Sequence, residues 1–157
     1  MKMYFKQKAF SLRQRSEIFD EQGNVLFTAL GELLSIGRKM HICDSSGTKV
    51  AFVQQRVLRL LPRFSVYIGE QHIADIVKEF TFFKPKYRIE GLDWSIQGDL
   101  FSHDYVIQSG GENIAAIHKR WMSWGDSYEI EIIRDSDAVM ALAVIIAIDC
   151  VLDDSGS

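Results

Sequence analysis

The chain has few cysteines and few prolines, and both shortages exclude whole classes of protein. Its 157 residues include two of each. Cys43 and Cys150 lie far apart and form no CxxC pair, which favours two free thiols in a reducing cytoplasm. Few prolines and no low-complexity run exclude an obvious linker. Fractions of 47% hydrophobic and 25% charged residues exclude wholesale disorder.

Long apolar runs are missing as well. The longest run, 138–148, has eleven residues, whereas a helix that spans a bilayer needs roughly 20. Lys6 and Lys8 stand where a signal peptide requires its apolar region, so we expect no secretory signal. We therefore expect a cytoplasmic protein without a transmembrane segment, which could reach a membrane only from its surface. Residues 1–154 are predicted to form one domain, followed by a short tail over 155–157.

The charges are distributed unevenly along the chain. Residues 1–88 carry 15 Lys and Arg against 8 Asp and Glu, whereas residues 89–157 carry 3 against 13. Such asymmetry is found in proteins that present a basic surface to anionic partners. It is equally consistent with two halves of one fold that neutralise each other.

Short alternating segments separated by turn residues dominate the chain. Four hairpin units, at 19–27, 42–53, 66–76 and 106–117, each place a Gly or an Asp/Ser/Gly turn between two alternating runs. Alternation of apolar and polar residues with period two is typical of strands with one buried face. The segment 56–63 is predicted to be a helical turn or a bent connection. The predicted strands lie near 4–7, 15–19, 25–30, 39–43, 50–55, 64–68, 72–79, 86–90, 94–98, 104–108, 114–119 and 128–133.

The apolar run predicts a helix over 137–152 that must be covered on every face. Polar residues at 135–137 precede it and can cap its first N–H groups. A helix about 10 Å across needs a wider interior than the roughly eight strands that side chains alone can fill. We therefore predict an all-β fold, a closed antiparallel barrel of about twelve strands around a hydrophobic C-terminal helix. The alternative, a two-sheet sandwich with the helix across one side, would leave half of an apolar helix exposed.

Basic residues supply the candidate binding surface. Positions 84, 86 and 88 alternate and would share one face of a strand, whereas positions 56, 59 and 63 recur at helical spacing. Near an anionic membrane each such side chain contributes roughly 1 kcal/mol. The alternative is that they form solvated faces or ion pairs with the acidic C-terminal half. The candidate ligand-binding residues are Lys84, Lys86, Arg88, Arg56, Arg59, Arg63, Lys119 and Arg120.

No residue pattern indicates catalysis, a metal or a cofactor. The chain has no Gly-rich phosphate loop, no HExxH and no GxSxG, and its four histidines are scattered. Asp149, Asp153 and Asp154 offer oxygens to Ca²⁺ but lack the spacing of a calcium-binding loop. We expect Asp149 either to face water or to pair with a Lys or Arg of the barrel wall. The expected protein is not an enzyme and needs no cofactor or metal.

Two kinds of partner remain open. One is an anionic phospholipid head group, and the other is a protein partner of an interaction or scaffold protein that binds no lipid. A nucleic-acid partner is not expected, because the chain is acidic overall. The oligomeric state is left open by the sequence.

Several segments together resemble the LURP-one-related family, which belongs to the Tubby C-terminal-like group and has the phospholipid scramblases as more distant relatives. The resemblance implies a twelve-stranded barrel around a central hydrophobic C-terminal helix. Tubby proteins imply phosphoinositide binding, and scramblases imply membrane and Ca²⁺ association. Neither group's binding residues can be placed on this sequence residue by residue. The segments that carry the resemblance are 4–8, 34–39, 80–87, 91–94, 123–130 and 147–154.

Overall fold

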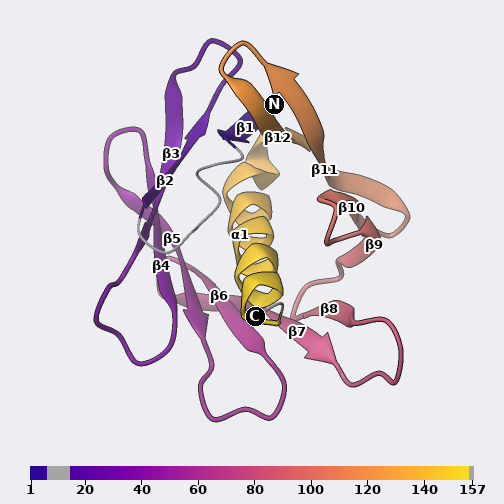
Figure 1. The fold of residues 1–157 in the computed structure, drawn as a ribbon. Coiled ribbons are helices and arrows are strands. Elements are labelled where there is room, and N and C mark those ends of the chain that lie inside the picture. Colours follow the sequence, from indigo (N-terminus) through magenta and orange to yellow (C-terminus); the bar gives the residue numbers. More distant parts are fainter. Residues whose placement is uncertain (7–14, 156–157) are drawn as a thin grey trace.

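Twelve antiparallel strands wrap around one helix in the computed structural model, which describes residues 1–6 and 15–155 (Figure 1). The strands are short, and many of the hairpin turns contain glycine or aspartate, whereas the connections over 56–62 and 80–85 contain neither. The strands are β1 (Lys2–Lys6), β2 (Arg15–Phe19), β3 (Val25–Gly31), β4 (Lys39–Asp44), β5 (Lys49–Gln55), β6 (Arg63–Ile68), β7 (Gln71–Glu79), β8 (Lys86–Glu90), β9 (Ser95–Asp99), β10 (Asp104–Ser109), β11 (Glu112–Met122) and β12 (Gly125–Ile132).

Alternation along the strands creates the inner face of the barrel. In β4, Met40 and Ile42 are fully buried while their neighbours are partly exposed, and β5 repeats this pattern at Ala51 and Val53. The four predicted hairpins are confirmed as the antiparallel pairs β2–β3, β4–β5, β6–β7 and β10–β11. Side chains with period two therefore point to one side, as expected for a sheet with one buried face.

The barrel is nearly closed. Hydrogen-bonded ladders connect the strands in the order β8-β7-β6-β5-β4-β3-β2-β1-β12-β11-β10-β9. β8 and β9 are in contact but share no ladder, so the sheet has one seam. Across it, the rings of Tyr87 and Phe101 lie 6.2 Å apart. The predicted all-β barrel is confirmed, except that among the described residues it is nearly closed and has a seam between β8 and β9.

The helix α1 (Ala138–Ser155) fills the interior, after a 3₁₀ turn, η2 (Asp135–Asp137). Residues 141–151 are buried on all sides of the helix. Burying each Leu, Ile or Val side chain stabilises the fold by about 1.5 to 3 kcal/mol. The helix ends three residues later than the predicted 152, because Asp153 and Asp154 continue it at the surface.

Two further properties bear on the expected surroundings of the protein. Cys43 is half-buried and Cys150 is buried, and both are free thiols. Among the described residues, no helix has the length and apolar character that crossing a bilayer requires.

Candidate functional site

Three long loops extend from the same end of the barrel, the end at which α1 finishes (Figure 1, lower edge). They connect β3 to β4 over residues 32–38, β5 to β6 over 56–62, and β7 to β8 over 80–85. The other hairpin turns that the structure describes are shorter. We call these three segments, with Lys86 at the start of β8, the loop end.

The bases of the loops are held together by backbone contacts. Gln55 N donates to Arg38 O at 2.8 Å, and the Gln55 side chain accepts from Arg38 N at 3.0 Å. Gly37 has a φ of +77°, and a Cβ at this position would lie 2.6 Å from the Val57 side chain. Lys78 N donates to Pro62 O at 3.1 Å, which ties the second loop to β7. The loops are therefore anchored where they leave the barrel.

Four cationic side chains at the loop end are exposed: Arg56, Arg59, Lys84 and Lys86. None of them forms a salt bridge with another residue that the structure describes. The segment 56–62 is a connection without a helical turn, so of the two predicted alternatives the bent connection is confirmed, and Arg63 is the first residue of β6. The prediction that positions 84, 86 and 88 share a strand face holds for Lys86 and Arg88, because β8 begins only at Lys86.

Two other predicted ligand residues are engaged in ion pairs. Arg63 donates to Asp75 at 2.6 Å and to Glu90 at 2.7 Å, and these hydrogen bonds to the carboxylates of Glu90 and Asp75 raise the pKa of Arg63. Arg88 pairs with Glu90 and lies 3.6 Å from Glu79. Both arginines thus link β6, β7 and β8 through ion pairs, the alternative that the sequence left open for these basic residues, and their role in ligand binding stays a prediction.

The last predicted pair lies away from the loop end. Lys119 and Arg120 are in β11, which runs to the upper end of the barrel in Figure 1. Arg120 Nε lies 3.3 Å from the buried carboxylate of Glu129, which also accepts a bond from Tyr4 at 3.0 Å. Lys119 is exposed and forms no salt bridge within the described part of the chain. Reversal of its charge therefore changes the net charge of the protein without changing the loop end.

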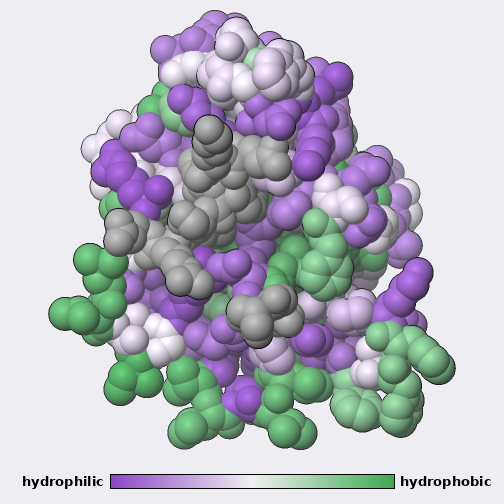
Figure 2. All heavy atoms as spheres, in the orientation of Figure 1, coloured by the Kyte–Doolittle hydropathy of each residue, from purple (hydrophilic) through white to green (hydrophobic). Residues whose placement is uncertain are grey.

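The loop end also carries large apolar side chains that the sequence analysis did not single out. Figure 2 shows hydrophobic side chains gathered in separate groups along the lower edge of the molecule, at the tips of the loops. Their signal in the sequence is the occurrence of leucine, isoleucine and phenylalanine in connections, where polar residues are usual. The residues are Leu33, Leu34, Ile36, Val57, Leu58, Leu60, Phe80, Phe82 and Phe83.

Behind the loops, the C-terminal part of α1 borders a cavity of about 260 Å³. Asp149, which lines it, is buried and lies 3.1 Å from His103 Nε2, and His103 stacks on Tyr128 with ring centroids 4.4 Å apart. Arg38 donates to Asp153 at 2.9 Å. The expectation that Asp149 faces water or meets a Lys or Arg is therefore wrong, since its partner is a histidine from the turn between β9 and β10.

Burial raises the pKa of Asp149 to about 6, although His103 opposes the shift. The unfolded chain ionises this carboxyl near pH 4, so the barrel loses stability as the pH rises from about 4 to about 6. Asp149→Asn removes this loss and keeps an acceptor for His103. We expect the variant to exceed the wild type in free energy of unfolding by about 3 kcal/mol at pH 7.5 and by little at pH 4. Urea titrations at both pH values measure this, and a difference independent of pH would contradict it.

Within residues 1–6 and 15–155, no three His, Cys, Asp or Glu side chains are placed to hold a metal ion. Asp153 bonds Arg38, and Asp154 accepts from the Gln55 side chain at 3.0 Å. The carboxylates at the end of α1 thus hold the bases of the loops.

Comparison with known proteins agrees with this fold. The chain is 34% identical over 152 residues to the uncharacterized protein YxjI of Bacillus subtilis strain 168, covering 97% of this chain and 94% of that protein. The X-ray structure of an Arabidopsis thaliana protein superposes with a TM-score of 0.61 at 19% identity, over 99% of this chain and 91% of the plant chain. The model of the LURP-one-related family matches residues 1–149. The chain therefore belongs to the LURP-one-related family.

Proposed function

We propose that this protein is a non-enzymatic binding module that attaches to the surface of anionic phospholipid membranes, from the cytoplasm, through its loop end. The observation that supports it is a cluster of four exposed cationic side chains on two loops and the start of β8, without salt bridges among the described residues: Arg56, Arg59, Lys84 and Lys86. Other arginines nearby are neutralised by carboxylates, so these four define where an anionic surface is attracted.

The expected strength is modest. Four basic residues at roughly 1 kcal/mol each amount to about 4 kcal/mol, or nearly a thousandfold preference for an anionic over a neutral surface. Salt screens exposed charges over about 10 Å at 0.1 M and over shorter distances at higher concentration. Attachment should therefore be reversible and sensitive to salt.

Charge reversal at the loop end tests the proposal. The variant with Arg56→Glu, Arg59→Glu, Lys84→Glu and Lys86→Glu should lose at least a hundredfold in affinity for vesicles of phosphatidylcholine with about a third phosphatidylglycerol. Its binding to pure phosphatidylcholine should not change. Co-sedimentation at about 0.1 M and about 0.5 M salt measures both.

Lys119→Glu is the matched control, because Lys119 is exposed and lies away from the loop end. The affinity of Lys119→Glu for anionic vesicles is compared with that of each single charge reversal at the loop end. Arg59→Glu is the first of these to be measured. Equal losses in the control and the loop variants would refute the loop end as the binding surface. Failure of the wild type to bind anionic vesicles would refute the function, and a stoichiometric protein partner without lipid binding would favour an interaction role.

A further inference from the structure

We infer that the tips of the three loops insert their apolar side chains into the bilayer beneath the head groups, so that binding has a component that salt cannot remove. This inference rests on the proposed function. Its first support is the location of the exposed apolar residues. Of thirteen large hydrophobic side chains exposed among the described residues, nine lie in loops 32–38, 56–62 and 80–85. Exposed hydrophobic side chains are normally scattered, and their concentration indicates an interaction surface.

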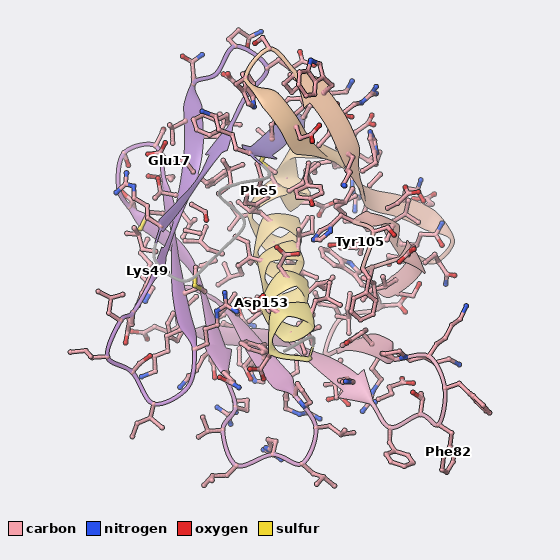
Figure 3. The ribbon with its side chains drawn as sticks, viewed as in Figure 1. Phe5, Glu17, Lys49, Phe82, Tyr105 and Asp153 are labelled. Carbon is pink, nitrogen blue, oxygen red and sulfur yellow. The ribbon has the colours of Figure 1, made fainter. Side chains whose placement is uncertain are left out.

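The degree of exposure excludes a role in the core. Leu34, Leu58 and Leu60 are 102%, 101% and 99% exposed, and Phe83 is 96% exposed. None of them belongs to the buried cluster around α1. Figure 3 shows Phe82 pointing away from the barrel at the tip of its loop. Polar residues at these positions would therefore leave the fold equally stable.

The backbone conformation of the second loop is strained at its apolar tip. Leu58 has a φ of 61°, in the left-handed region that glycine or asparagine adopts with less strain. A turn alone would thus favour a different residue at this position. Leucine there combines backbone strain with full exposure, and contact with an apolar phase would compensate both.

The arrangement of charge favours a membrane over a protein as the occupant. Arg56 and Arg59 flank Leu58, and Lys84 and Lys86 follow Phe82 and Phe83 in the chain. Apolar tip residues with cationic side chains beside them in the loops match an anionic interface, in which the apolar side chains reach the acyl chains and the long cationic side chains extend to the phosphates. The tips form separate groups in Figure 2, a shape that a fluid surface can surround.

Polar replacement at the tips tests insertion while leaving the charges in place. The pairs are Leu33→Ser with Leu34→Ser, Leu58→Ser with Leu60→Ser, and Phe82→Ser with Phe83→Ser. Each pair should weaken binding to the same anionic vesicles about tenfold or more at low salt, given the transfer free energy of one or two large apolar side chains. At about 0.5 M salt, where charge is screened, the remaining binding should be lost.

Trp121→Ser is the matched control, because this aromatic side chain is 77% exposed but lies on β11. It should bind like the wild type. Thermal melts should show the tip variants to be folded, since none of the replaced side chains is buried. As a second readout, the added fluorescence of Phe82→Trp over the wild type should be quenched by lipids brominated on their acyl chains.

The outcomes separate the two proposals. If the tip variants bind like the wild type at both salt concentrations while charge reversal abolishes binding, insertion is wrong and electrostatic attachment stands. If the wild type itself does not bind anionic vesicles, the proposed function fails. If the tip variants instead abolish a self-association of the wild type, the tips form a protein interface and insertion is wrong.

Discussion

Val144→Asp should lower the free energy of unfolding by about 5 kcal/mol or more, enough to unfold the barrel. Val144 lies in the middle of α1 and is 0% exposed. A carboxylate at this position would face apolar side chains on every side, without a cation or donor to pair with. Domains of this size are stable by about 5 to 15 kcal/mol in total. Urea unfolding followed by circular dichroism measures the loss.

Val57→Asp is the matched control, since the same substitution falls on a valine that is 42% exposed in the second loop. It should change stability by no more than about 0.5 kcal/mol. Removal of residues 138–157 should also unfold the barrel, because it exposes the apolar inner face of the sheet to water. A truncated chain that stays soluble and unfolds cooperatively would show that the helix is not the core.

Gly98→Ala should cost about 3 kcal/mol or more. Gly98 lies in β9 with a φ of +119°, where residues other than glycine are strained. A Cβ at this position would lie 2.6 Å from the carbonyl oxygen of Asp104 and 2.8 Å from Tyr105 Cα, both backbone atoms of β10. Relief of that clash requires β9 to move from its partner at the seam of the barrel. The change in urea midpoint measures the cost.

The variant Gly125→Ala separates the cost of backbone strain at a positive φ from the cost of a steric clash of the new Cβ. Gly125 has a similar φ of +109°, but nothing lies within 4 Å of the position of its Cβ. This variant should lose only the roughly 1 to 2 kcal/mol of backbone strain. Equal losses in the two variants would mean that close packing of β9 against β10 contributes nothing.

Local patterns were enough to predict the fold. Strands 15–19 and 86–90 were predicted with the boundaries that the structure shows, because alternation and turn residues are local signals. The barrel followed from one requirement, that a helix apolar on all sides be enclosed. Strand β11 is longer than the predicted 114–119, since its ends extend into the hairpins on either side.

The binding surface was less predictable, because it depends on pairing between strands. Nothing local indicates that Arg63 meets Asp75 and Glu90, which lie 12 and 27 positions further along the chain. The contact between His103 and Asp149 spans 46 positions. By contrast, the apolar loops carry a local signal, the adjacent leucines at 33–34 and the phenylalanines of 80–83. It acquires meaning only once those loops are seen at one end of the barrel (Figure 1).

Partition of the wild-type chain between vesicles of differing charge tests the central claim most directly. Co-sedimentation compares pure phosphatidylcholine with phosphatidylcholine that contains about a third phosphatidylglycerol, at about 0.1 M salt. We predict binding to the anionic vesicles at least a hundredfold tighter than to the neutral ones, with a fraction that remains bound at about 0.5 M salt. Equal and negligible binding to both kinds of vesicle would contradict the membrane role of the loop end.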